Sequence, residues 1–165
     1  MKELYIDFDG VILDTIGESY KMMDEAGIDK KNYEDCFKFY SNLDWVDMIK
    51  KSPEINDSMN CIKKIMESGK FRVSILTHIT TLEEGIAKIN YIRRRLKDIT
   101  VILVPKKISK TKMVHSEGSI LVDDYAGNLR EWENAKGIGI RFSTKLNGKG
   151  FLVIDKLDKI LELDI

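Results

Sequence analysis

The chain has 165 residues and a mass of 19.0 kDa, a size that favours one domain with at most a small insertion. Its 27 Lys and Arg residues balance its 27 Asp and Glu residues, so the formal net charge is zero. Without a basic excess, the chain lacks the usual electrostatic means of binding a nucleic-acid polymer or an anionic membrane surface. Hydrophobic residues make up 43% of the chain, which is enough for a core and excludes wholesale disorder.

The sequence also gives expectations about the compartment. The first six residues lack the pattern of a secretory signal, and no apolar run approaches the roughly 20 residues that span a bilayer. Cys36 and Cys61 form neither a CxxC pair nor a disulfide framework, which favours two reduced thiols. We therefore expect a cytoplasmic protein with no membrane partner, either a monomer or a homodimer.

Short apolar runs rich in branched residues alternate with helical patterns along most of the chain. Nearly continuous apolar character is typical of strands that are buried on both faces. A stripe of Leu82, Ile86, Ile89, Ile92 and Leu96 predicts one of the intervening helices, and Leu129 and Trp132 predict another. This alternation predicts an α/β fold, a parallel sheet with helices on both faces. The expected strands are residues 4–8, 71–76, 99–104, 119–122, 137–142 and 151–154, the last followed by a helix.

Residues 15–69 interrupt the alternation, because they contain helical patterns and no convincing strand. Ile55, Met59, Ile62 and Met66 mark the last of these helices. A helical block between the first and second strands predicts a small cap inserted into the core. We expect a core of residues 1–14 and 70–165 and a cap of residues 15–69.

Polar side chains stand where the expected strands end, and ligands bind beyond the carboxyl ends of parallel strands. Asp7 and Asp9 end the first strand and are followed by Gly10, which permits a sharp turn. The second strand ends in Thr77 and His78, and the fourth in Asp123 and Asp124.

Four carboxylates at one sheet edge need a counter-charge, because an uncompensated buried ion costs several kcal/mol. A divalent hard cation with oxygen ligands supplies that charge, and carboxylates, a backbone carbonyl and waters suit Mg²⁺. A nearby lysine would complete a site for a dianionic phosphate. The candidates lie in a basic patch before the fourth strand, which contains Lys106, Lys107, Lys110 and Lys112.

In this order, the motifs Asp7-Phe8-Asp9-Gly10-Val11-Ile12, Ile75-Leu76-Thr77, a lysine near Lys110, and Ile120-Leu121-Val122-Asp123-Asp124 resemble those of the haloacid dehalogenase (HAD) superfamily. The resemblance spans residues 4 to about 142 and implies a Rossmann-like core. It implies that Asp7 is a nucleophile that becomes an aspartyl-phosphate and that Asp9 is the general acid/base. It implies that Asp7, Asp124 and the Asp9 backbone carbonyl hold Mg²⁺, with Asp123 in support. Thr77 and a lysine would bind the phosphoryl group, with Lys110 preferred over Lys112 or Lys107 and with His78 as a further candidate.

Within that superfamily, the helical cap and the run Asp123-Asp124-Tyr125-Ala126-Gly127-Asn128-Leu129 through Trp132 are similar to the 5′(3′)-deoxyribonucleotidases. The chain departs from that branch in having no lysine shortly after Thr77. The cap is rich in aromatic residues, most of which a small cap needs for its own core. One or two of them could stack on a nucleobase, and the candidates are Phe37, Tyr40 and Trp45.

The sequence therefore predicts a Mg²⁺-dependent phosphomonoesterase that acts on a small-molecule phosphate monoester, with a nucleoside 5′-monophosphate as the expected substrate. A phosphatase or phosphomutase for a sugar phosphate or another small phosphometabolite is the alternative. A non-catalytic binding protein with the same fold is a rival from another class. The joint presence of Asp7, Asp9, Thr77 and Asp124 argues against it.

Overall fold

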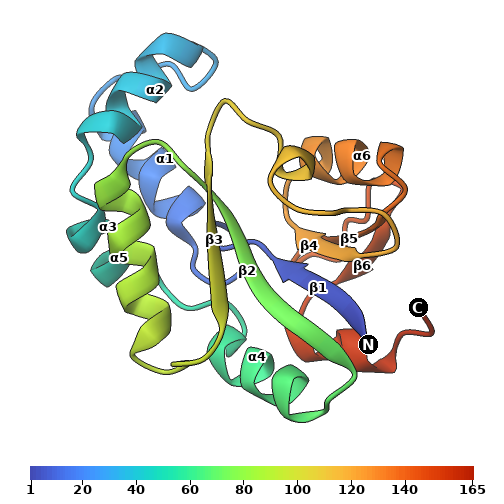
Figure 1. Cartoon of the computed structure of the whole chain (residues 1–165). Coiled ribbons are helices and arrows are strands. Elements are labelled where there is room, and N and C mark those ends of the chain that lie inside the picture. Colours follow the sequence, from blue (N-terminus) through green and yellow to red (C-terminus); the bar gives the residue numbers. More distant parts are fainter.

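A computed structural model describes all residues, 1–165, as a six-stranded parallel sheet with helices on both faces (Figure 1). The strand order is β3-β2-β1-β4-β5-β6, and every neighbouring pair is parallel. The predicted α/β class and parallel sheet are thereby confirmed. The strands are β1 (Lys2–Ile6), β2 (Phe71–Ile79), β3 (Thr100–Pro105), β4 (Ile120–Asp123), β5 (Ile138–Phe142) and β6 (Leu152–Ile154).

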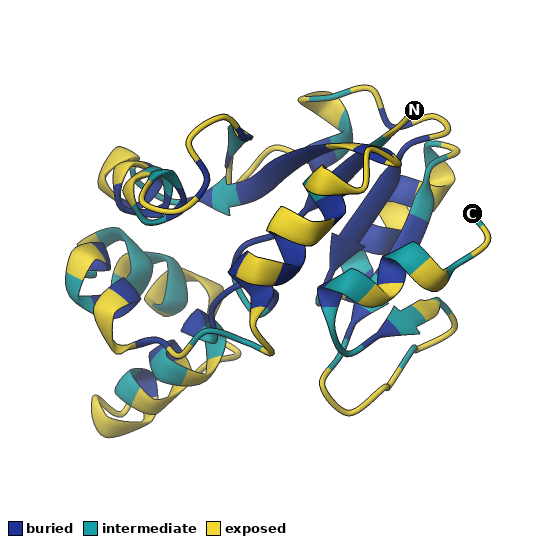
Figure 2. Ribbon diagram, turned by 90° about the horizontal axis from the view of Figure 1, so that it is seen from below, coloured by how far each residue is buried: buried dark blue, intermediate teal, exposed yellow.

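Most strand boundaries lie within two residues of the predicted ones, but β2 extends three residues further, to Ile79. β2 pairs with both β1 and β3, and its pairing with β3 continues as far as Ile79 and Pro105. Most residues of the central strands β1, β2 and β4 are buried, and Figure 2 shows these strands largely in dark blue. Burial on both faces is why these strands have continuous apolar sequences.

The two faces of the sheet carry unequal cores. Leu4, Ile6 and Ile75 belong to a cluster of 27 buried residues on one face, which α4 (Ser58–Glu67) and α5 (Leu82–Arg93) help to cover. Tyr5 and Leu121 point to the other face, where they pack with Leu129 and Trp132 of α6 (Ala126–Asn134). The alternating directions of side chains along a strand divide the apolar residues in this way. Leu129 and Trp132 are fully buried, as predicted.

The expected insertion contains four helices between β1 and β2, namely α1 (Thr15–Glu25), α2 (Tyr33–Asn42), α3 (Trp45–Lys51) and α4. In Figure 1, α1, α2 and α3 lie together at one side of the carboxyl ends of the strands, whereas α4 lies below the sheet. Met59 and Ile62 of α4 belong to the main core. α4 therefore packs as part of the core layer, and α2, which has no buried residue, is the most exposed helix of the insertion.

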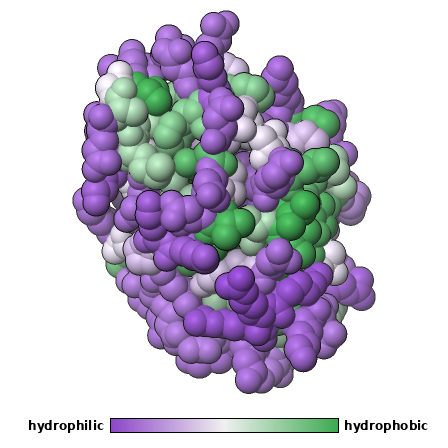
Figure 3. Space-filling model, turned by 90° about the vertical axis from the view of Figure 1, so that its left-hand side faces the viewer, coloured by the Kyte–Doolittle hydropathy of each residue, from purple (hydrophilic) through white to green (hydrophobic).

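The helix predicted after the last strand is the 3-10 helix η2 (Leu157–Glu162), which buries Leu157 and Ile160 at a spacing of three residues. One predicted feature differs from the structure. In α5, Leu82 and Ile86 are 72% and 58% exposed and do not belong to a buried stripe. Figure 3 shows the side of the molecule on which α3 and α5 lie, where apolar side chains reach the surface. None of the helices has both the length and the apolar composition that crossing a membrane requires.

Candidate active site

The carboxyl ends of β1 and β4 lie next to each other at the centre of the sheet. β1 is flanked by β2 on one side and β4 on the other, so the strand order changes direction there. Such a point in a parallel sheet is where ligands bind. Asp7 directly follows β1, and its backbone N–H donates a 2.9 Å hydrogen bond to the carbonyl of Val122 in β4. This bond holds Asp7 against the end of β4, where Asp123 and Asp124 lie.

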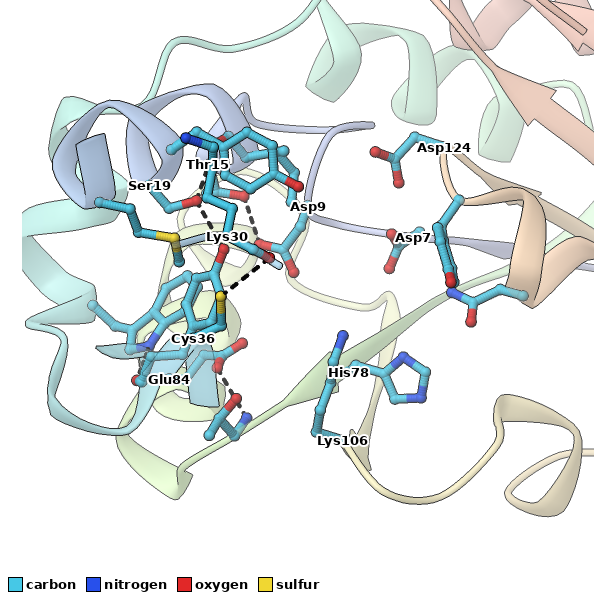
Figure 4. A pocket seen from close by; sticks show the side chains of 18 of the residues that line it. Asp7, Asp9, Thr15, Ser19, Lys30, Cys36, His78, Glu84, Lys106 and Asp124 are labelled. Carbon is cyan, nitrogen blue, oxygen red and sulfur yellow. Dashed lines mark hydrogen bonds between the residues drawn. The ribbon is translucent and has the colours of Figure 1, made fainter. Parts of the chain in front are cut away.

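Three carboxylates form a compact acidic cluster. Asp7, Asp123 and Asp124 each offer an oxygen, and these oxygens all lie within 4.8 Å of one another. Figure 4 shows Asp7 and Asp124 side by side at the edge of the pocket. Burial, together with repulsion by the other carboxylates, raises the pKa of Asp7 to about 7 and the pKa of Asp124 to about 8. The cluster therefore holds more negative charge than the protein alone compensates.

Lys110 is the cation that the protein itself brings to this cluster. It lies in the short 3-10 helix η1 (Lys110–Lys112), which Ser109 caps, and it is 2% exposed. Its Nζ donates to Asp7 Oδ1 at 2.8 Å and to Asp123 Oδ2 at 2.7 Å. Burial lowers the pKa of Lys110, but the two carboxylates outweigh this effect and raise it above its ordinary value. Lys110 is thus held as a cation against Asp7.

The other lysine candidates lie elsewhere. Lys107 and Lys112 are exposed, and the Lys107 ammonium lies 5.5 Å from the centre of the Phe37 ring. Lys106 is also exposed, but it lines the pocket, and Figure 4 shows its side chain extending toward it. Of the three lysines considered for the phosphoryl group, the structure brings only Lys110 to Asp7.

Asp123 and Asp124 have different surroundings. Asp123 is fully buried, and it accepts hydrogen bonds from the Tyr125 backbone N–H and from Asn128 Nδ2, both at 2.9 Å, in addition to Lys110. Asp124 is partly exposed, and its carboxylate accepts no hydrogen bond from another group of the protein. A carboxylate with such a free oxygen beside Asp7 is a suitable ligand for a hard divalent cation. The donor set and its excess negative charge therefore fit Mg²⁺.

Asp9 lies across the pocket from the cluster, next to Thr15 of the insertion (Figure 4). The Thr15 hydroxyl donates to Asp9 Oδ1 at 2.6 Å, and Lys88 Nζ donates to Asp9 Oδ2 at 2.6 Å. The side chain of Asp9 is 20% exposed. Asp9 therefore faces the pocket on one side and a buried lysine on the other.

Lys88 is a residue of the site that sequence reasoning missed. It lies in α5, is fully buried, and also donates to Glu84 Oε2 at 2.6 Å. The predicted apolar stripe placed residues 82 and 86 inside the protein, whereas the inward face of α5 carries Glu84 and Lys88. The one available sequence signal is the Glu-to-Lys spacing of four residues, which occurs far more often on exposed helix faces.

Thr77 and His78 differ in their access to the pocket. Thr77 is fully buried, its hydroxyl accepts a 3.2 Å hydrogen bond from Lys88, and it is not among the residues that line the pocket. β2 continues for two residues beyond Thr77, which encloses this side chain in the sheet. His78 does line the pocket, and its Nε2 lies 2.8 Å from the carbonyl oxygen of Ile108. Burial lowers the pKa of His78 below its ordinary value.

The pocket between the sheet edge and the insertion has a volume of about 350 Å³. Tyr40 and Trp45 line it, whereas Phe37 does not. Tyr40 and Trp45 are stacked, with ring centres 6.3 Å apart and planes inclined by 22°, and the Tyr40 hydroxyl lies 3.0 Å from Ser19 Oγ. Sequence reasoning did not identify the remaining wall residues from the insertion, which are Ile16, Ser19, Tyr20, Met23, Lys30 and Cys36.

Comparison with known proteins gives structural matches. No protein-family model and no curated protein sequence matches the chain. Among solved structures, a HAD phosphatase from Thermococcus onnurineus superimposes with a TM-score of 0.64 at 14% identity, over 98% of this chain and 97% of that one. A HAD-superfamily hydrolase of subfamily IA from Geobacter sulfurreducens gives 0.61 at 12% identity, over 98% of each chain. The chain has the HAD fold.

A third solved structure contains a bound anion. CbbY from Rhodobacter sphaeroides, in complex with phosphate, superimposes on the HAD fold of this chain with a TM-score of 0.57 at 14% identity, over 97% of this chain and 96% of that one. At these identities the likeness concerns the fold, and the chemistry of this chain has to be argued from its own side chains.

Proposed function

We propose that the protein is a Mg²⁺-dependent phosphomonoesterase that works through an aspartyl-phosphate on Asp7. The observation that carries the proposal is the group around Asp7, namely a cationic Lys110 at 2.8 Å, a partly exposed Asp124 in the same cluster, and Asp9 on the opposite wall of one pocket. A nucleophile and an acid/base group that line one cavity, with a charge-stabilising cation held against the nucleophile, are parts that phosphoryl transfer needs. The phosphatase and hydrolase neighbours support the same reaction class.

In the first step, an Asp7 carboxylate oxygen attacks phosphorus and the bond between phosphorus and the ester oxygen breaks. Asp9 gives a proton to the departing alkoxide, which leaves as an alcohol. In the second step, Asp9 takes a proton from water, the water oxygen attacks the aspartyl-phosphate, and the bond between Asp7 and phosphorus breaks to release inorganic phosphate. In the proposal, the Lys110 ammonium that contacts Asp7 stabilises the negative charge that develops on the phosphoryl oxygens. Asp7, Asp124 and the backbone carbonyl of Asp9 would hold Mg²⁺, which supplies further positive charge to those oxygens.

The burial of Thr77 limits how it can bind the phosphoryl group in this proposal. Because its hydroxyl is buried against Lys88, binding of the phosphoryl group by Thr77 requires that side chain to turn toward the pocket. His78 and Lys106 already line the pocket and are available to a phosphate without such a change. The helical insertion, in particular α1 to α3, acts in the proposal as the cap that encloses the leaving group.

The reaction is tested by measuring inorganic phosphate release from p-nitrophenyl phosphate with Mg²⁺ and with EDTA. Activity that needs Mg²⁺ and disappears in Asp7→Asn is expected. An Asp7→Asn variant as active as the parent would exclude Asp7 as the nucleophile. Lys112→Met is the surface control, because Lys112 is exposed.

The substrate we propose is a nucleoside 5′-monophosphate, with preference for deoxy forms. Tyr40 and Trp45 support this proposal, because both line the pocket and an aromatic face can stack on a base. A panel of ribo- and deoxyribonucleotides and sugar phosphates tests it. Equal kcat/KM for nucleotides and for ribose 5-phosphate would favour the sugar-phosphate alternative, and a requirement for trace bisphosphate would indicate a mutase.

A further inference from the structure

Helix α5 has charged groups on its inward face and apolar groups on its outward face. Glu84 is 3% exposed and Lys88 is fully buried, whereas Leu82 and Ile86 of the same helix are exposed. Gly85 lets the helix approach β3 closely, because a Cβ atom there would lie 2.5 Å from Leu103 Cδ1. Burying a charged pair in this way is costly unless its members are compensated and hydrogen-bonded. The helix therefore buries Lys88 behind the pocket, where its charge needs compensating partners.

Hydrogen-bond acceptors and aromatic rings surround the Lys88 ammonium group. An ammonium group has three protons, and four oxygens lie within 3.2 Å of Lys88 Nζ. They are Asp9 Oδ2 and Glu84 Oε2, each at 2.6 Å, the carbonyl of His78 at 3.0 Å, and Thr77 Oγ1 at 3.2 Å. Its Nζ also lies 5.0 Å from the ring centre of Trp45 and 5.4 Å from that of Phe8, within the range of cation–π attraction.

These contacts join three parts of the protein. Asp9 follows β1, Thr77 and His78 lie in β2, and Trp45 belongs to the insertion. Lys88 contacts Asp9 from the side away from the pocket, while the Thr15 hydroxyl holds the other Asp9 oxygen at 2.6 Å. In both contacts, Asp9 accepts a hydrogen bond, from Thr15 and from Lys88. A carboxylate that accepts hydrogen bonds in this way is the form of Asp9 that can take a proton from water. Each Asp9 oxygen is thereby fixed in direction.

We propose that Lys88 is a positioning residue for Asp9, which it orients for the water step of the reaction. This inference rests on the proposed function, because it requires an aspartyl-phosphate on Asp7 and a base at Asp9. Lys88 itself does not line the pocket and acts through Asp9. Outer-shell groups that orient metal ligands typically contribute 10- to 100-fold, and a loss of similar size is expected when Lys88 is removed.

The test is a double-mutant cycle with p-nitrophenyl phosphate and Mg²⁺. Lys88→Gln alone would leave Glu84 as an unpaired buried charge, so Lys88→Gln and Asp9→Asn are each made, and then combined, in a Glu84→Gln background. The aryl leaving group needs no proton, so nitrophenol release reports attack by Asp7, while steady turnover includes the water step. Lys63→Gln is the control, because Lys63 belongs to an exposed pair with Glu67 that has the same spacing of four residues.

In the Glu84→Gln background, Lys88→Gln is expected to lower kcat by about 10- to 100-fold with KM changed less than threefold. A burst of about one nitrophenol per enzyme is expected before the slow turnover, because the first step stays fast. Once Asp9→Asn is present, Lys88→Gln should lower kcat by less than about threefold more. Lys63→Gln should leave kcat and the time course as in the parent.

Three results would overturn the inference, namely an unchanged kcat, a loss of kcat without a burst, or an equal loss with and without Asp9→Asn. If the Gln variant melts below the assay temperature, Lys88→Arg enters the same cycle, because it keeps the charge and changes the donor geometry. The parent enzyme and the Asp7→Asn variant test the proposed function independently of Lys88. A parent without Mg²⁺-dependent phosphate release, or an active Asp7→Asn variant, refutes the proposed function, whereas an active parent with an additive cycle refutes only the role of Lys88.

Discussion

A Cβ atom at Gly10 would lie 2.3 Å from Asp124 Oδ2, so the turn after β1 and the end of β4 meet with no room for a side chain. Gly10 also has a φ of +75°, in the left-handed region that favours glycine. We predict that Gly10→Ala displaces Asp124 from the acidic cluster. The left-handed backbone adds roughly 1–2 kcal/mol of destabilisation, and kcat should fall by at least tenfold, measured as Mg²⁺-dependent phosphate release.

The Gly27→Ala variant separates the effect of backbone strain from the effect of displacing Asp124. Gly27 has a φ of +68°, but nothing lies within 4 Å of the position of its Cβ atom. It should therefore show a similar loss of unfolding free energy in urea, without the loss of kcat. If both variants lose activity equally, the close contact between Gly10 and Asp124 has no functional consequence.

Lys110 should matter for both catalysis and stability. Lys110→Met removes the cation that contacts Asp7 and Asp123, and kcat should fall by about 10²–10³-fold, as when a donor to a developing oxyanion is lost. Breaking a buried pair leaves the carboxylates uncompensated, which costs about 3–5 kcal/mol of unfolding free energy. Urea unfolding and phosphate release below the melting temperature check the two effects. Activity in Lys110→Met equal to that of the exposed-site variant Lys112→Met would exclude this role.

The acidic cluster predicts that metal binding and pH act together on stability. The pKa of Asp7 is raised to about 7 and that of Asp124 to about 8, from an ordinary value of 3.8. Between those values the folded state binds more protons than the unfolded state, so without metal the free energy of unfolding falls as pH rises from about 4 to about 8. Mg²⁺ needs the ionised carboxylates, so it should restore stability at the upper end of this range.

The measurement is the melting temperature in Mg²⁺ and in EDTA at pH 5 and pH 8. A large rise with Mg²⁺ is expected at pH 8, since a ligand at 100 times its Kd contributes about 2.7 kcal/mol, and a small rise at pH 5. In Asp124→Asn, which lacks one of the carboxylates, the rise at pH 8 should be much smaller. An equal rise at both values of pH, or an unchanged rise in Asp124→Asn, would contradict a metal site at this cluster.

The sheet and the acidic cluster are predictable from the sequence for the same reason. Strands such as β4 contain continuous apolar runs, here residues 120–122, and the carboxyl ends of parallel strands must meet at one edge. The residues that follow these runs, Asp7 and Asp123 among them, are therefore expected to lie close together, as they do. The sequence also favours Lys110 over Lys107 and Lys112, because Lys110 follows Ser109, a good helix-capping residue close to that edge.

What the sequence did not reveal depends on contacts between distant segments. Lys88 is buried because Asp9, which is 79 residues away, pairs with it, and no periodicity within α5 contains that information. The same helix leaves Leu82 and Ile86 outside, contrary to the apolar spacing. Thr77 is enclosed because β3 pairs with β2 as far as Ile79, which a local apolar run ending at Leu76 does not indicate.

The aromatic residues of the insertion give the last prediction, because the structure separates Tyr40 from Phe37. Tyr40 lines the pocket and stacks on Trp45, whereas Phe37 lies outside the pocket and stacks on Tyr33, with ring centres 6.2 Å apart. If Tyr40 contacts the base, Tyr40→Leu should lower kcat/KM for a nucleotide by about tenfold, since stacking contributes about 1–3 kcal/mol. The value for ribose 5-phosphate, which has no base, should change less than threefold. Phe37→Leu should alter neither value, and equal losses for both substrates in Tyr40→Leu would show that Tyr40 shapes the pocket without selecting the base.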